Sequence, residues 1–107
     1  HLFWTDWQTR KIMRAGFDGQ GVRVFWDAAA VAQEVRRPRS LALDSAASQI
    51  YWTDWDAHSI SRANFDGSRF EDIVTKTSAG IACPDGLQVD SEGSRLYWAD
   101  TCTGMIQ

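Results

Sequence analysis

The stretch Ile-Tyr-Trp-Thr-Asp-Trp at residues 50–55 decides the fold of this chain, because it recurs along the sequence. Close copies are Leu-Phe-Trp-Thr-Asp-Trp at residues 2–7 and Leu-Tyr-Trp-Ala-Asp at residues 96–100, at offsets of 48 and then 46 residues. Self-similarity at a spacing of about 20 to 50 residues is typical of repeat architectures. We therefore expect a little more than two copies of one structural unit.

Two further motifs follow the same offsets. Ile-Met-Arg-Ala-Gly-Phe-Asp-Gly at residues 12–19 matches Ile-Ser-Arg-Ala-Asn-Phe-Asp-Gly at 60–67, and Pro-Arg-Ser-Leu-Ala-Leu-Asp at 38–44 matches Pro-Asp-Gly-Leu-Gln-Val-Asp at 84–90. These matches predict that the whole chain, residues 1–107, forms one partial repeat domain. Its repeat units are expected at about 1–37, 38–83 and 84–107.

Each unit contains short apolar runs that predict four β-strands. The runs are rich in Val, Ile, Leu and aromatic residues and are separated by turn residues, which is typical of strands. The Asp-Gly pairs at 18–19 and 66–67 provide the positive φ of a tight hairpin, so adjacent strands are expected to be antiparallel. The predicted strands are an inner strand (41–44, 87–90), a Tyr-Trp strand (2–6, 50–54, 96–100), a third strand (11–15, 59–63 and part of 104–107) and an outer strand (22–26, 70–75). The Ala-rich stretch at 28–35 predicts a long loop with at most one helical turn.

Neighbouring Tyr and Trp residues point to opposite faces of a strand, so both faces of each sheet are expected to be buried. A four-stranded sheet covered on both faces by similar sheets is a blade of a β-propeller. The predicted fold is therefore all-β: a partial β-propeller of about two and a half four-stranded antiparallel blades.

The composition agrees with a globular domain and excludes several functions. The 107 residues are 44% apolar, include six Trp and carry a formal net charge of −3. Lys and Arg are spread along the chain, which provides no basic patch for nucleic acid. No apolar run reaches the roughly 18 residues of a membrane span.

The three motifs together resemble the YWTD repeats, also called low-density-lipoprotein receptor class B repeats. They are Tyr-Trp-Thr-Asp at 51–54 with near copies at 3–6 and 97–100, Arg-Ala-Asn-Phe-Asp-Gly-Ser at 62–68, and Pro-x-Gly-Leu-x-x-Asp at 84–90. The resemblance covers nearly the whole chain. It implies a six-bladed propeller of an extracellular receptor or basement-membrane protein, and hence an extracellular or cell-surface location. It also implies structural roles, with no part in catalysis, for the signature residues Trp4, Asp6, Tyr51, Trp52, Asp54, Tyr97, Trp98 and Asp100.

The length of the chain leaves the source of the remaining blades open. At most ten strands are predicted, whereas a closed six-bladed ring needs about twenty-four. Either the remaining blades come from a longer chain, or a homodimer or homotrimer assembles the ring. The open faces of such a partial ring invite association.

The two cysteines are expected to meet across the last hairpin. If the strands on either side of residues 91–94 pair without interruption, Cys83 faces Cys102 at a Cα separation of about 4.5 to 5.5 Å, which a disulfide spans. The alternative is two free buried thiols. One repeat earlier, the same pairing places Arg37 opposite Asp56.

The function expected from these features is non-catalytic binding of a protein or peptide on the loop face of the propeller. Trp beside charged residues is common at interfaces. The alternative for the Trp residues is packing between blades, and for His58 a plain loop position; Arg36, Arg37 and Arg39 form either a solvated loop or a contact for an acidic peptide. The candidate ligand-binding residues are Trp7, Arg10, Trp55, Asp56 and His58.

No enzyme signature is present, and no cofactor is expected. The alternative class is part of a metal-dependent propeller enzyme of the lactonase or lyase type, which needs carboxylate or His ligands on the propeller axis. Only Asp44 and Asp90 are placed to approach that axis, and we interpret both as turn residues because they stand beside turns. No metal site is therefore predicted.

Overall fold

The computed structural model describes residues 2–6, 8–27, 37–55, 58–75, 83–90, 92, 95–102 and 104–106. These residues form strands and turns, with no helix among them. The predicted 28–35 loop lies outside the described residues. The ten strands are β1 (Leu2–Asp6), β2 (Lys11–Ala15), β3 (Arg23–Asp27), β4 (Pro38–Asp44), β5 (Gln49–Asp54), β6 (Ser59–Asn64), β7 (Glu71–Thr75), β8 (Pro84–Asp90), β9 (Arg95–Asp100) and β10 (Met105–Ile106).

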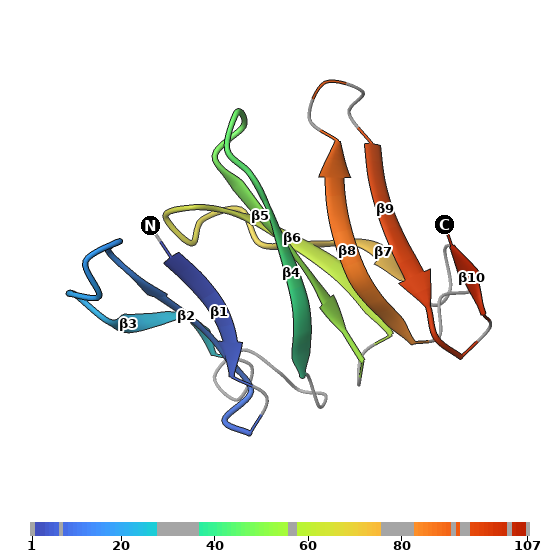
Figure 1. Cartoon of the computed structure of the whole chain (residues 1–107), viewed down its shortest axis with the longest axis horizontal. Helices are drawn as coiled ribbons and strands as arrows, with labels where there is room; N and C mark the ends of the chain where they lie inside the picture. The colour runs from blue at the N-terminus through green and yellow to red at the C-terminus, as the bar shows by residue number, and fades with distance from the viewer. Residues whose placement is uncertain are drawn as a thin grey trace.

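The strands form three antiparallel sheets that stand side by side like the segments of a fan (Figure 1). We call them blade 1 (β1-β2-β3), blade 2 (β4-β5-β6-β7) and blade 3 (β8-β9-β10). The β4 strand contacts both β1 and β8, so the inner strand of blade 2 lies between the first strands of the other two blades. The predicted all-β, partial-propeller fold is confirmed. The inner strands begin earlier than predicted, at Pro38 and Pro84.

Hairpin turns fix the order of strands within a blade. In blade 2, the N–H of Gly67 donates to the carbonyl of Asn64 at 2.9 Å, and the N–H of Asn64 donates to the carbonyl of Ser68 at 2.9 Å. Gly67 has a φ of +88°, a left-handed conformation that costs other residues about 1 kcal/mol or more. The Asp-Gly motif therefore makes the tight turn that the sequence predicts.

A β-bulge near the start of each inner strand corrects the predicted register. The pairing of β8 with β9 runs from Asp90↔Arg95 to Gln88↔Tyr97, and then shifts by one residue before Asp85↔Ala99. Gly86, inside the bulge, has a φ of +57°. The β4–β5 pair has the same shift between Pro38 and Leu41. An uninterrupted register, as assumed from the sequence, is therefore wrong at the start of both inner strands.

The shift changes which residues face each other at the loop ends. The Thr101 N–H donates to the carbonyl of Cys83 at 3.0 Å, so Thr101, and not Cys102, lies opposite Cys83. The Trp55 N–H donates to the carbonyl of Arg37 at 3.4 Å, so Trp55 takes the register position opposite Arg37 that the sequence assigned to Asp56. The cause is the extra residue that a bulge inserts in one strand.

The hydrophobic core is divided into two layers, one in each junction between blades. Between blades 1 and 2, the indole rings of Trp26 and Trp52 have centroids 5.2 Å apart, and Trp52 has no exposed surface. Between blades 2 and 3, Ile60 and Leu87 are buried and Tyr51 and Trp98 pack against them. Tyr51 and Trp52 thus serve opposite faces of blade 2.

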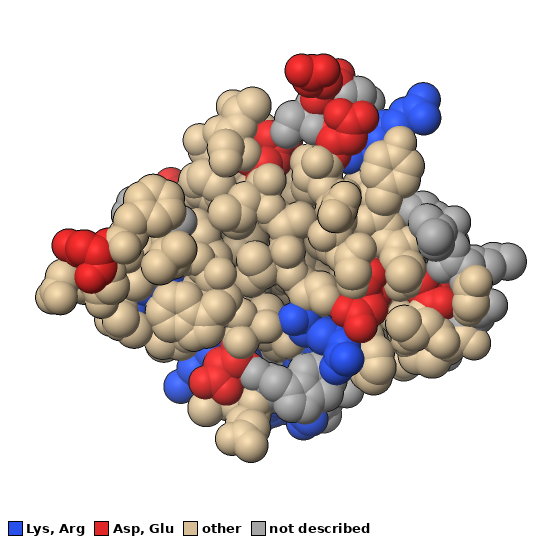
Figure 2. Space-filling model, in the orientation of Figure 1, with Lys and Arg blue, Asp and Glu red and all other residues tan. Residues whose placement is uncertain are grey.

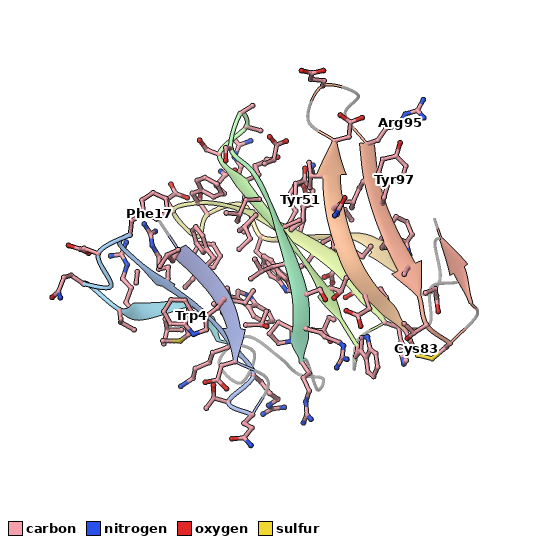
Figure 3. The ribbon with its side chains drawn as sticks, in the orientation of Figure 1. Trp4, Phe17, Tyr51, Cys83, Arg95 and Tyr97 are labelled. Atoms are coloured by element: carbon pink, nitrogen blue, oxygen red, sulfur yellow. A yellow bond between two sulfur atoms is a disulfide. The ribbon has the colours of Figure 1, made fainter. Side chains whose placement is uncertain are left out.

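In blades 1 and 3, the positions of the Tyr-Trp signature that face outward are not covered by another described blade. Trp4 occupies in β1 the position that Trp52 occupies in β5, yet 38% of its surface is exposed. Tyr97 in β9 corresponds to Tyr51 and is 43% exposed. Figure 3 shows Trp4 and Tyr97 on opposite flanks of the fan, with Tyr51 between them. Burial of these aromatic residues therefore depends on an adjacent blade.

We expect Trp52→Ala to lower the free energy of unfolding by about 3 to 5 kcal/mol, because it removes a fully buried indole from the junction. Trp4→Ala is the matched control at the same repeat position and should cost about 1 kcal/mol, because that indole is already partly solvated. Urea denaturation followed by circular dichroism measures both values. Equal losses for the two variants would contradict the assignment of Trp52 to a junction.

Candidate functional site

One end of the three sheets carries Arg10, Trp55 and His58, the described residues that the sequence associates with binding. The strands β1, β5 and β9 end there, and β4 and β8 begin there (Figure 1). We call this end the loop face and the opposite end, which contains the hairpin turns, the turn face. Figure 2 shows acidic and basic side chains side by side at the loop face, whereas the middle of this side of the molecule is largely uncharged. The described loop-face residues include 8–10, 37–40, 55, 58, 83–86 and 101–102.

Trp55 is held at the boundary between blades 2 and 3. Its indole Nε1–H donates to the carbonyl oxygen of Pro84 at 2.7 Å. The guanidinium carbon of Arg39 lies 4.1 Å from the centre of the indole ring, which is a cation–π contact. Trp55 is nevertheless only half-buried. The indole is thus fixed in place before any partner arrives.

A polar cluster beside Trp55 joins the three blades at their inner strands. Arg39 Nε donates to Asp85 Oδ2 at 2.9 Å, which links blade 2 to blade 3. The Ser40 hydroxyl donates to the other carboxylate oxygen, Oδ1, which also accepts the Gly86 N–H at 2.9 Å. The Thr5 hydroxyl of blade 1 donates to the carbonyl of Arg39 at 2.8 Å. A shallow cavity of about 370 Å³ opens over Thr5, Arg39, Ser40 and Asp85.

The charge of Asp85 is favoured by this cluster. Partial burial by itself raises the pKa of the carboxyl, but the hydrogen bonds from Ser40, Arg39 and the Gly86 N–H outweigh it, so the pKa lies below the usual value of 3.8. Asp85 therefore remains ionised and paired with Arg39 at neutral pH.

The Asp of each repeat signature binds backbone at the entrance of the inner strand. Asp54 is fully buried, and its Oδ1 accepts the Arg37 N–H at 3.0 Å. Asp100 is 1% exposed, and its Oδ1 accepts the N–H groups of Cys83 at 3.2 Å and Cys102 at 3.1 Å. Arg37 and Cys83 both precede a proline, so the two carboxylates fix the same corner in successive blades.

Asp6, the signature Asp of the first repeat, bonds within its own loop. Its Oδ1 accepts the Thr9 N–H at 3.2 Å. This backbone hydrogen bond, with one from the Thr9 hydroxyl, lowers the pKa of Asp6 below 3.8. The carboxylate of the first repeat therefore shapes the β1–β2 loop.

A disulfide joins Cys83 to Cys102 at the loop face of blade 3, with Cα atoms 5.3 Å apart. Figure 3 shows it at the foot of β8 and β9. Since Cys83 faces Thr101, the bond reaches one residue beyond the direct partner. It fastens the start of the inner strand to the loop that follows β9.

Of the predicted ligand-binding residues, the structure describes Arg10, Trp55 and His58. Arg10 and His58 are half-buried and occupy the same repeat position at the end of the loops that precede β2 and β6; both have left-handed backbones, with φ of 60° and 52°. Trp7 and Asp56 lie outside the described residues.

Sequence reasoning missed the Thr5, Ser40 and Asp85 cluster and assigned Arg39 only to a basic loop. The available signal was the repeat alignment, which places Arg39 and Asp85 at equivalent positions of consecutive inner strands with opposite charges. Residues at equivalent positions of adjacent blades lie side by side, so an opposite-charge pair there predicts a contact.

Asp44 and Asp90 lie at the turn face, and not at the loop face. Asp44 Oδ1 accepts the Ala47 N–H at 3.2 Å within the turn that follows β4. Within the described ranges, no group of three His, Cys, Asp or Glu residues is arranged to hold a metal ion. In the same part of the chain, no helix has the length and apolar character needed to cross a membrane.

Comparison with known proteins agrees with the repeat structure. The family model for the low-density lipoprotein receptor repeat class B matches residues 1–45 and 48–91. The fold is also similar to a chain in the crystal structure of a nidogen/laminin complex, with a TM-score of 0.76 and 28% sequence identity. That match covers 92% of this chain and 34% of the solved chain, so the protein spans about a third of its structural relative. No curated protein sequence matches the chain.

The antiparallel blades, the aromatic junctions and the loop-face carboxylates define part of a β-propeller module. Within that class, the chain belongs to the low-density lipoprotein receptor class B, or YWTD, repeat family.

We expect Asp85→Asn to lower the free energy of unfolding at pH 7 by about 1 kcal/mol, because it removes the charge that pairs with Arg39. The pKa of Asp85 is depressed on folding, so its contribution is present above the unfolded value of 3.8 and is lost as pH falls through the lower folded value. Urea denaturation of both proteins between pH 7 and pH 3 should show the difference shrinking only at the acid end. A difference that does not depend on pH would contradict the ion pair.

Proposed function

We propose that this chain is part of a non-catalytic interaction module that works outside the cell or on its surface and binds a protein or peptide through the loop face. Membership of the YWTD repeat family supports the extracellular location, as does the Cys83–Cys102 disulfide, because disulfides persist in oxidising compartments. The structural relative was solved as a nidogen/laminin complex, which is a complex between two proteins. A protein partner is the corresponding proposal for this chain.

The observation that carries the proposal is the fixed, half-buried indole of Trp55. A partner that packs on this ring meets a side chain already held by Pro84 and Arg39, so little conformational entropy is lost on binding. Trp and Arg are also the residue types most often found at the energetic centres of interfaces. The ring and the polar cluster beside it offer apolar contact and hydrogen bonding on one surface.

The loops on either side extend this proposed surface. Arg10 and His58 stand at matching positions of the β1–β2 and β5–β6 loops, with Trp7 and Asp56 in the same loops by sequence. Repetition of one loop on adjacent blades gives an extended face that an elongated peptide segment can follow. We include these four residues, with Trp55, in the proposed ligand-binding set.

The second part of the proposal concerns the open flanks of the fan. We propose that further blades of the same kind cover them. Leu2 and Trp4 on blade 1 and Tyr97 on blade 3 are large apolar residues with 38% to 45% of their surface exposed. The chain also spans only 34% of its structural relative. We propose that a longer chain provides the remaining blades, with a homodimer or homotrimer as the alternative.

We expect Trp55→Ala to weaken binding to laminin, used as the probe because it is the partner in the related complex, by at least tenfold. Biolayer interferometry on the folded 107-residue chain measures the change. Phe17→Ala is the matched control: Phe17 is 80% exposed on the hairpin turn after β2, at the opposite end of the sheet. Equal affinity of wild type and Trp55→Ala, or an equal loss in the control, contradicts binding through the loop face.

We expect light scattering after size exclusion to give the monomer mass of 12.0 kDa, independent of concentration, if a longer chain provides the other blades. Two or three times that mass would instead show that copies of this chain associate. In that case Tyr97→Asp, which places a charge on the open flank of blade 3, should restore the monomer. An oligomer that Tyr97→Asp leaves intact would contradict association through the flanks.

A further inference from the structure

A cavity of about 410 Å³ lies between blades 2 and 3 at the turn face, away from the proposed binding surface. Tyr51, Arg62 and Ile73 line it from blade 2, and Val89 and Leu96 line it from blade 3. Its volume is within the range of about 300 to 1,000 Å³ that is typical of ligand sites. Asp44, Gln49, Asp90 and Arg95 form the polar part of its rim, and the Arg62 guanidinium lies beside the Tyr51 ring.

The repeat allows comparison with the equivalent position in the junction between blades 1 and 2, which is filled. Phe3, Arg14 and Phe25 of blade 1 occupy the positions of Tyr51, Arg62 and Ile73 in blade 2, each 48 residues earlier. Between blades 1 and 2 these residues surround Phe65, which the hairpin after β6 carries. The rings of Phe3 and Phe65 have centroids 5.4 Å apart, and those of Phe3 and Phe25 are 5.3 Å apart.

The backbone of Phe65 is bound in that place as well. Arg14 Nη1 donates to the carbonyl oxygen of Phe65 at 2.9 Å, while the guanidinium carbon of Arg14 lies 5.6 Å from the centre of the Phe3 ring. The Phe65 N–H donates to the carbonyl of Ser48 at 2.9 Å. Phe3 therefore contacts the phenyl ring of Phe65, and Arg14, which lies on Phe3, binds the carbonyl of the same residue.

The cavity between blades 2 and 3 reproduces this arrangement. The guanidinium carbon of Arg62 lies 6.0 Å from the centre of the Tyr51 ring, close to the value for Arg14 and Phe3. Arg62 bonds Glu71 through Nε and Nη2, whereas Arg14 uses Nη1 to hold the Phe65 carbonyl. In the repeat pattern, the counterpart of Phe65 is carried by the hairpin that follows the third strand of the next unit.

We propose that this cavity is a binding site for a phenyl side chain presented on a tight turn, and that its occupant is the Phe-Asp-Gly hairpin tip of a further repeat. The ring lies against Tyr51, Ile73 and Leu96, and Arg62 donates to the carbonyl of the same residue. This inference rests on the second part of the proposed function, that further repeats of the same kind adjoin this chain. The site is separate from the loop face, so loss of binding at Trp55 would not affect it.

The test uses a cyclised synthetic peptide with the hairpin sequence of residues 62–68, Arg-Ala-Asn-Phe-Asp-Gly-Ser, added to the 107-residue chain. Methyl NMR spectra should show saturable shifts for Ile73, Val89 and Leu96. The same peptide with Ala in place of Phe should bind at least tenfold more weakly. This comparison leaves the protein unchanged, so it cannot be confused with unfolding.

Variants of the protein locate the site. Tyr51→Ala and Arg62→Gln should each weaken the peptide at least fivefold, with amide spectra that verify the fold. Tyr97→Ala is the control, because Tyr97 has the same repeat position as Tyr51 but lies on the open flank of blade 3. Absence of methyl shifts, equal binding of the Phe and Ala peptides, or binding that Tyr97→Ala removes and Tyr51→Ala leaves unchanged would overturn the proposal.

Discussion

The structure depends on the burial of aromatic side chains between adjacent blades. A single sheet of this chain cannot bury both of its faces, and Tyr and Trp at consecutive positions make both faces apolar. Blade 2, with a neighbour on each side, buries Trp52 completely against Trp26 and packs Tyr51 against the junction with blade 3. Each blade is therefore stabilised mainly by contact with the next, which is the energetic pattern of repeat proteins. The loop face and the cavity at the turn face are both consequences of this stacking, since each is built from residues of two blades.

Polar contacts fix the conformation of the strand ends, which apolar burial alone does not. Burial in the junctions is non-directional, so it leaves the ends of the strands free to take several conformations. At the loop face, the carboxylates of Asp54 and Asp100 bind the backbone just before Pro38 and Pro84 and set the start of each inner strand. The bulge that follows brings Arg39 and Asp85 into contact across two blades and leaves the Trp55 ring clamped beside them. These bonds to backbone groups and between paired charges hold Arg39, Asp85 and the Trp55 ring in one arrangement.

The sequence predicted the number and order of the strands because hydrophobic alternation and Asp-Gly turns are local signals. It also predicted the Cys83–Cys102 disulfide, which is confirmed, although from a register that is wrong by one residue. The bulge that shifts the register depends on the backbone conformation of one residue, here Gly86 at a φ of +57°. A glycine in the sequence does not by itself predict a bulge, because glycine also occurs in turns. The Arg39–Asp85 contact was missed for a different reason. It joins two strands 46 residues apart that do not pair with each other, so only the geometry between blades brings the charges together.

Comparison of equivalent positions in the three blades shows how far the burial of a residue depends on an adjacent blade. Trp4 and Trp52 share a place in the repeat, yet one is 38% exposed and the other has no exposed surface. Phe65 lies against Phe3 in a junction, whereas Phe17, at the same position of the preceding hairpin, is 80% exposed. The local sequence is nearly the same in each pair, so the difference arises from the presence or absence of a blade on that side. Because an exposed phenyl or indole gains free energy when it is covered, about 25 cal/mol for each Å² of apolar surface, both flanks of this chain favour contact with a blade of its own kind.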